Sequence, residues 1–175
     1  MTALPTELPE PLRPFFAYWH SLPKVGHLPK LADFFDHVPP AVAPYLAIAD
    51  VIGPGDARLR FFGTRLVERA EFDPTGLSVA AVYAGTLRKK IHEVMWAAVQ
   101  RPVGYVLRRT IVVRSGFLNE NVSLALPVEI PTSRLRAVIA FTQGIAEVQM
   151  IDRGEDTLVQ EMRFERWVDV GAGTP

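Results

Sequence analysis

Three β-rich segments follow one another in the second half of the chain, and they constrain its fold most strongly. Residues 103–113 are rich in β-branched side chains, residues 117–128 alternate between apolar and polar positions, and residues 135–148 contain an uninterrupted apolar run. Only short connections separate the three segments, and no helical pattern lies between them. Adjacent strands without regular strand–helix alternation predict an antiparallel sheet rather than a doubly wound parallel one.

A hairpin and most of the helices precede these three strands. Apolar residues with a period of two flank a turn cluster at residues 53–56, which predicts a hairpin. Residues 64–72 return to helical spacing, and residues 85–100 show the clearest helix, with an apolar stripe opposite a charged face. The chain is therefore predicted to be an α+β protein. We expect an antiparallel five-stranded sheet, with short helices and one long helix across one face.

An amphipathic helix is predicted near the N-terminus, over residues 11–22, where apolar and aromatic side chains recur at helical spacing. Its aromatic face is wide and must be covered, either by this domain or by a second copy. We expect a homodimer that forms through this helix. The side chains expected at that interface are Leu12, Phe15, Phe16 and Trp19.

Three parts are expected along the chain. A length of 175 residues suits one domain with one core. Residues 1–22 form a lead and the N-terminal helix, residues 23–148 form the main domain, and residues 149–175 form a C-terminal extension. Within that extension, residues 157–168 are predicted to form a last strand or helix.

Composition argues against several classes of function. The 19 Lys and Arg residues balance the 19 Asp and Glu residues and are dispersed, so no nucleic-acid partner is expected. The chain has no cysteine, which excludes disulfides, thiolate nucleophiles and cysteine-bound metals. No stretch approaches the ~18 apolar residues that a membrane span needs, and the first residues lack the features of an export signal. A cytoplasmic location is expected.

Catalytic motifs are absent from the sequence. It has no Gly-x-Ser-x-Gly elbow, no Walker loop and no Gly-x-Gly-x-x-Gly fingerprint. The segment from His92 to Trp96 begins like a helical zinc motif, but tryptophan stands where the second histidine is needed. The spacing of His20, His27 and His37 matches no known ligand set. We therefore predict no catalytic residues and no metal site.

The predicted elements follow a definite order: two strands, several short helices, one long helix and three more strands. Short sequence stretches between residues 18 and 141 support the same comparison. These stretches are Tyr18-Trp19, Leu28-Pro29, Asp33-Phe34, residues 46–51, residues 60–66, Asp73-Pro74-Thr75-Gly76, residues 101–104 and Leu126-Pro127. In both respects the chain resembles a PAS domain, of the bacterial stand-alone family formerly described only as a domain of unknown function. The tail from residue 147 to 170 extends past the core PAS unit.

The resemblance implies a non-catalytic sensor or protein-interaction module, which binds a small molecule and signals through another signalling protein. The long helix of a PAS domain crosses the sheet, so the expected ligand pocket lies between them. His92 and Arg109 are the polar groups expected to orient the ligand. The candidate ligand-binding residues are Tyr83, His92, Trp96, Tyr105, Leu107, Arg109 and Phe141.

The resemblance also bears on cofactors. Haem-binding relatives generally use a histidine of the long helix, which makes His92 the residue that would bind a haem. Relatives that sense light through a flavin need a cysteine, which this chain lacks. A small organic ligand is therefore the expected occupant, rather than haem.

Two alternatives from other classes remain open at this stage. The chain could form a small enzyme with a cone-shaped fold similar to nuclear transport factor 2, which uses a His–Asp pair for general acid–base catalysis. That alternative places His92 or His20 within hydrogen-bond reach of a carboxylate at the base of an open cavity. The other alternative, a structural adaptor, predicts no cavity.

Overall fold

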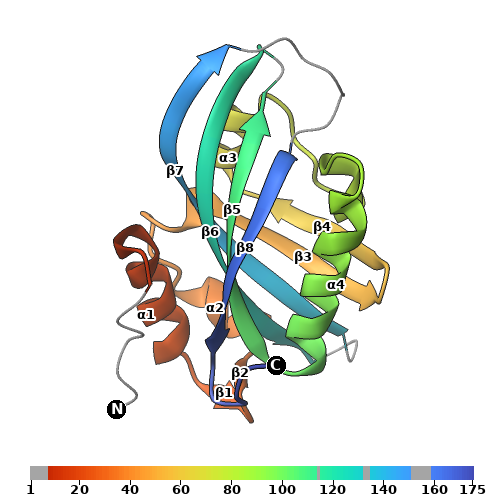
Figure 1. Cartoon of the computed structure of the whole chain (residues 1–175). Coiled ribbons are helices and arrows are strands. Elements are labelled where there is room, and N and C mark those ends of the chain that lie inside the picture. Colours follow the sequence, from red (N-terminus) through yellow and green to blue (C-terminus); the bar gives the residue numbers. More distant parts are fainter. Residues whose placement is uncertain (1–7, 114, 132–134, 151–158) are drawn as a thin grey trace.

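A six-stranded antiparallel sheet runs through the centre of the computed structural model, which describes residues 8–113, 115–131, 135–150 and 159–175 (Figure 1). The spatial order of its strands is β4-β3-β7-β6-β5-β8. The strands are β3 (Leu46–Gly53), β4 (Asp56–Phe62), β5 (Val103–Val112), β6 (Phe117–Ile130), β7 (Leu135–Met150) and β8 (Val159–Asp169). The α+β class and the antiparallel sheet are confirmed.

The sixth strand, β8, corrects the prediction of five strands. It pairs with β5 from Val103↔Asp169 to Ile111↔Val159, so the C-terminal segment belongs to the main sheet and is not an extension outside it. The predicted boundary at residue 149 falls inside β7. The physical reason is that β5 buries a long row of side chains, and β8 covers what would otherwise be an unpaired edge.

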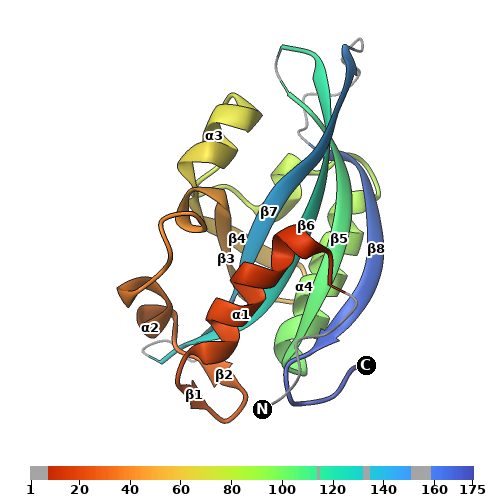
Figure 2. The ribbon, with the colours of Figure 1, turned by 90° about the vertical axis from the view of Figure 1, so that its left-hand side faces the viewer.

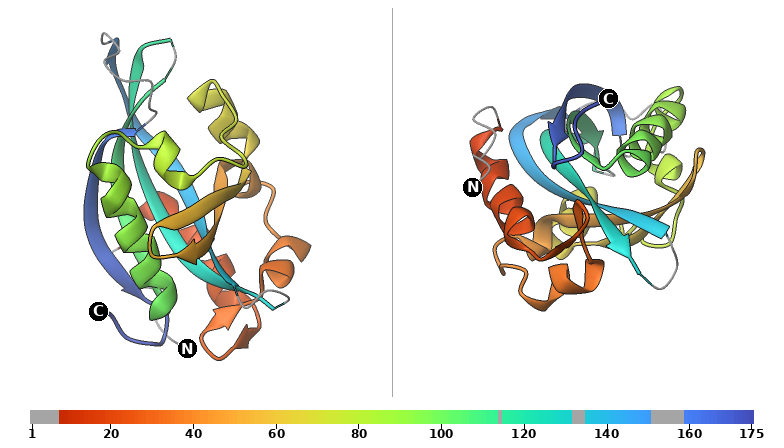
Figure 3. Two further views of the ribbon diagram at one scale, coloured as in Figure 1. Left: turned by 90° about the vertical axis from the view of Figure 1, so that its right-hand side faces the viewer. Right: turned by 90° about the horizontal axis from the view of Figure 1, so that it is seen from below.

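Helices cover both faces of the sheet. On one face lie α1 (Arg13–Ser21) and α2 (Leu31–Asp36); in Figure 2, α1 lies in front of the strands and α2 lies to their left. On the other face lie α3 (Thr64–Ala70), the 3-10 helix η3 (Val79–Val82) and α4 (Leu87–Gln100), as Figure 3 shows. The remaining short elements are η1 (Glu10–Leu12), η2 (Ala43–Tyr45), and the two-stranded pair β1 (Lys24–Val25) and β2 (Leu28–Pro29).

The two faces of the sheet carry two separate hydrophobic cores. The core on the α1 side contains large side chains, including Phe15, Trp19, Phe34 and Phe141. The core on the α4 side gathers residues of η3, α4 and the opposite face of the strands. Within the described part of the chain, no helix is both long and apolar enough to cross a membrane.

The aromatic face of α1 packs against the chain's own sheet, which corrects the predicted dimer interface. Leu12, Phe15 and Trp19 are fully buried, and Phe16 is 4% exposed. The ring of Phe15 stacks on that of Phe141 at 5.4 Å, and the indole N–H of Trp19 donates to the Pro127 carbonyl at 3.2 Å. These four side chains are therefore not exposed to a second copy, and the predicted homodimer would need another surface.

Truncation of Trp19 tests whether α1 is part of the core. Trp19→Ala removes a fully buried ring and its hydrogen bond, so the free energy of unfolding should fall by about 3–5 kcal/mol in urea titrations. Phe35→Ala is the control, because that ring on α2 is 42% exposed, and its loss should cost about 1 kcal/mol or less. Equal and small losses for both variants would contradict the packing of α1 on the sheet.

Candidate ligand-binding site

A cavity of about 570 Å³ lies between the sheet and the helical layer formed by α3, η3 and α4. Its floor comes from inward-facing residues of β3, β5, β6 and β7, and its walls come from α3, η3 and α4. Most of the lining is apolar. The structural adaptor, which predicted no cavity, is not supported by this arrangement.

A row of alanines creates the empty space. Ala47 of β3 pairs with Ala140 of β7, and Ala140 pairs with Ala125 of β6, so three methyl groups lie side by side across three strands. All three line the cavity, opposite Ile91 and Met95 of α4. Protein interiors are otherwise close-packed, so small side chains beneath a helix leave room that larger ones would fill.

Polar side chains occupy the next inward-facing position along the same strands, about 7 Å from the alanine row because inward positions recur every second residue. Ser123 of β6 pairs with Thr142 of β7, and their hydroxyl oxygens are 2.9 Å apart. Arg109 of β5 donates from Nη2 to both hydroxyls, with 3.0 Å to Thr142 Oγ1, and from Nη1 to the hydroxyl of Tyr83 at 3.2 Å. The cavity thus has an apolar end and a polar end.

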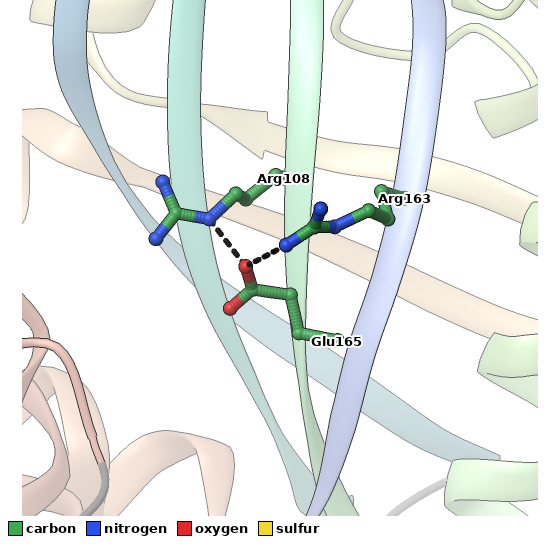
Figure 4. Close-up of polar contacts among 3 residues, drawn as sticks. All are labelled: Arg108, Arg163 and Glu165. Atoms are coloured by element: carbon green, nitrogen blue, oxygen red, sulfur yellow. Dashed lines mark hydrogen bonds and ion pairs between the residues drawn. The ribbon is translucent and has the colours of Figure 1, made fainter.

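The Arg109 guanidinium has neutral partners, which distinguishes it from its neighbour Arg108. Strand alternation turns Arg108 to the opposite face of β5, where it forms an ion pair with Glu165 that Arg163 also joins at 3.4 Å (Figure 4). In the described part of the chain, no carboxylate lies within ion-pair distance of Arg109, and its buried Nε has no hydrogen-bond partner. Among the described residues, the charge of Arg108 is balanced by Glu165, whereas that of Arg109 has no carboxylate partner.

A hydrogen-bonded contact spans the exposed rim of the cavity. Glu71 ends α3 with a left-handed backbone (φ 59°), and its carboxylate accepts two hydrogen bonds of 2.6 Å from the backbone N–H and the hydroxyl of Ser115. Both residues line the cavity. The contact ties the end of α3 to the turn between β5 and β6, and it engages the carboxylate of Glu71 away from Arg109.

Four of the predicted ligand-binding residues, Tyr83, Tyr105, Leu107 and Arg109, line this cavity. Phe141 does not, and its placement in the cavity wall was wrong. Strand alternation turns Ala140 and Thr142 to the cavity, so Phe141 between them faces α1. That these four residues bind a ligand stays a prediction.

His92 and Trp96 also do not line the cavity, and their placement in its wall was wrong. Ile91 and Met95 of α4 face the cavity. His92 and Trp96 each follow one of these residues in the sequence, so the turn of the helix directs their side chains away from the cavity. His92 is buried, and neither ring nitrogen has a hydrogen-bond partner within the described residues. A His92–carboxylate pair is thus not formed there, and His92 is not placed to bind a haem in this cavity.

The other histidine of the enzyme hypothesis, His20, is exposed beside Phe16 on α1, on the far side of the sheet from the cavity. In the described residues, no group of three His, Cys, Asp or Glu side chains could hold a metal ion. The His–Asp arrangement that an acid–base enzyme would need is therefore not found at this cavity.

Sequence reasoning missed the serine and threonine that hold Arg109. Ser123 and Thr142 are both buried, and the neighbouring Asn121 is buried too. Polar residues at positions 121 and 123 alternate with the apolar residues Val122 and Leu124, which was a detectable signal. In a sheet covered on both faces, polar residues on one inward-facing side mark a site rather than a solvent face.

Tyr105 of β5 pairs with Ala125 and continues the alanine row, and its buried hydroxyl leads to a prediction about pH. Burial raises the pKa of Tyr105 well above its ordinary value, with Tyr83 adding to the rise and Arg109 opposing it. A raised folded-state pKa gives stability that is present below about pH 10 and lost above it, because only the unfolded chain then releases the proton. Above that pH, the unfolding free energy of the wild type should fall more steeply than that of Tyr105→Phe, by up to about 1.4 kcal/mol per pH unit.

Urea unfolding of the wild type and of Tyr105→Phe between about pH 8 and pH 11 measures this difference. The difference at the lowest pH gives the contribution of the neutral hydroxyl itself, which is subtracted from the rest of the series. Parallel pH dependences of the two proteins would contradict the burial of the Tyr105 hydroxyl.

Comparisons with known proteins leave the family open: no protein-family model matches the chain, and no curated protein sequence matches it significantly. The function of the protein therefore has to be inferred from the cavity and from the residues that line it.

Proposed function

We propose that this protein is a non-catalytic, PAS-like sensor, which binds a small molecule in the cavity and signals through a partner protein in the cytoplasm. The order of elements supports the proposal, since β3 and β4 are followed by short helices, by α4, and by β5, β6 and β7. That is the order on which the resemblance rests. The strand β8 adds to it.

The cavity is the observation that carries the proposal. Its volume of about 570 Å³ lies within the range of ligand pockets, roughly 300–1,000 Å³. It is mostly apolar with a few convergent polar groups, which is the usual character of small-molecule sites. Without an occupant, the alanine row would leave an unfilled space beneath α4, an arrangement that protein cores avoid.

A bound molecule would touch both layers of the domain, and this suggests how occupancy becomes a signal. Arg109 belongs to the sheet, whereas Tyr83 follows η3 in the helical layer. The backbone of Tyr83 forms a bridge with Val159 at the start of β8, and the adjacent Ala84 N–H donates to the Val159 carbonyl at 2.9 Å. Occupancy would then shift the population between two arrangements of η3 and β8, which a partner can read.

The enzyme alternative lacks a supporting observation at this site. An acid–base mechanism needs a titrating group and an orienting partner within hydrogen-bond distance of each other. Among the described lining residues there is one carboxylate, that of Glu71, which accepts hydrogen bonds from Ser115 at the rim. Binding without chemistry is the function that the lining supports best.

Native mass spectrometry of protein purified gently from its own host tests the proposal. The wild type should carry an additional small-molecule mass. Ala140→Leu places a larger side chain on the cavity floor and should lose that mass, whereas Ala17→Leu makes the same change on the exposed face of α1 and should retain it. The proposal would be contradicted if the wild type carried no bound mass and no compound stabilised it in a metabolite thermal-shift screen.

A further inference from the structure

We infer that the ligand is a small monocarboxylate with an apolar body, whose carboxylate binds Arg109 and whose body lies over the alanine row. This inference rests on the proposed function, because it specifies the ligand of the same cavity. It follows from the charge, the hydrogen-bonding capacity and the shape of the lining.

The charge of Arg109 favours an anionic ligand. Buried or half-buried charges are normally paired, because a guanidinium taken out of water without an anion loses more solvation than neutral hydrogen bonds return. Among the described residues, the hydrogen-bond partners of Arg109 are the hydroxyls of Tyr83, Ser123 and Thr142, all neutral. An anion in the cavity would supply the missing counter-charge.

The free hydrogen-bond donor of Arg109 favours a carboxylate among the possible anions. A guanidinium offers five N–H donors, and the buried Nε–H of Arg109 has no partner among the described residues. Nε–H and one N–H of Nη2 form the edge that can hold a carboxylate through two parallel hydrogen bonds. Nη2 already donates to Ser123 and Thr142, so a carboxylate would take the unpartnered Nε–H and replace one of these hydroxyls on Nη2. An acceptor with two oxygens in one plane matches that edge, and a carboxylate is the common organic group of this kind.

The hydroxyls around the guanidinium add further donors. Tyr83 and Thr142 accept hydrogen bonds from Arg109, which leaves their own O–H hydrogens to be donated. Ser123 and Thr142 share one hydrogen bond, so one of those two hydrogens remains for a ligand. Tyr105 stays a neutral donor, because burial keeps its hydroxyl protonated. The polar end is rich in donors, which favours an acceptor such as a carboxylate.

Among the described residues, the apolar end has no partner for a charged group of the ligand. The floor beyond the hydroxyl row consists of Ala47, Ala125 and Ala140, and Ile91 and Met95 lie above it. No charged side chain faces this end among the described lining residues.

The remaining charged lining residues are at the rim. Arg69, at the end of α3, is exposed, and Glu71 is held by Ser115. Among the described lining residues, Arg69 is the other cation, so a second carboxylate could be paired only at the rim, and one in the apolar end would have no charge to balance it. A molecule with one carboxylate and an aliphatic or aromatic body fits both ends.

Titration calorimetry with matched pairs of compounds tests this inference on the full chain after dialysis. The probes are hexanoate, octanoate and decanoate, each compared with the primary alcohol of the same length. For the best-fitting length, the acid should bind the wild type at least about tenfold more tightly than its alcohol, which is the effect of one charge-assisted contact. Arg109→Gln should abolish this preference by weakening the acid and not the alcohol.

Two further variants keep the test independent of folding. Arg109→Lys retains the charge and should retain part of the preference, although it loses the paired hydrogen bonds. Arg108→Gln changes the neighbouring arginine on the opposite face, and the preference should stay that of the wild type. The acid-to-alcohol ratio of the wild type needs no variant, so it stands even if Arg109→Gln does not fold.

Each outcome has a separate meaning. Equal binding of acid and alcohol by the wild type would overturn the carboxylate inference and leave the proposed function intact. If no probe binds to a protein that carries a co-purified mass, the ligand class is wrong and the cavity function stands. If no probe binds and no mass co-purifies, both fail.

Discussion

The alternation of side chains in the central strands β6 and β7 is the constraint on which the rest of the structure depends. Along β7, Ile139 and Phe141 turn to the α1 side, where they join a solid core. Ala140 and Thr142 turn to the α4 side and form part of the cavity floor. The same strand thus builds a filled layer on one face and a hollow one on the other, because its large and small residues alternate with the period of the strand.

This division of labour between the faces explains how the domain can contain a cavity and remain folded. On the α1 side, the buried rings of Phe15, Trp19 and Phe34 belong to one hydrophobic core. Burial of such rings contributes most to the stability of a domain of this size. The α4 side can therefore contain small residues and an arginine. These residues contribute less to the free energy of folding than the large rings of the α1 side, but they form the cavity.

Elements with a strong periodicity could be predicted from the sequence, and side-chain directions within them could not. The hairpin at residues 53–56, the long helix and the three late strands were found, because each has turn residues or a clear repeat. The side of α4 that faces the cavity was harder to predict, because the adjacent side of the helix also carries large residues. His92 and Trp96 were predicted to line the cavity because of their polar and aromatic groups, but the apolar residues beside them, Ile91 and Met95, face it.

The same limit explains the errors at Phe141 and at β8. Residues 137–141 are apolar at every position, so hydrophobicity alone does not reveal which ones face which layer. The two largest residues, Ile139 and Phe141, do face the same layer, but Ala137 and Val138 show that size alone does not separate the two faces. For β8, a period-two pattern interrupted by a bulge opposite Val106 and Leu107 weakens the strand signal, and its partner β5 is distant in sequence.

The position of Arg109 connects the cavity to the parts of the fold that sequence reasoning placed outside it. Its strand β5 is paired with β8 on one side and with β6 on the other, and its guanidinium reaches Tyr83 in the helical layer. Tyr83 in turn is bridged through its backbone to Val159 of β8. A ligand that draws the guanidinium toward itself would weaken or redirect its contact with Tyr83. Because that contact and the bridge to β8 share one residue, the proposed function would couple occupancy of the cavity to this edge strand.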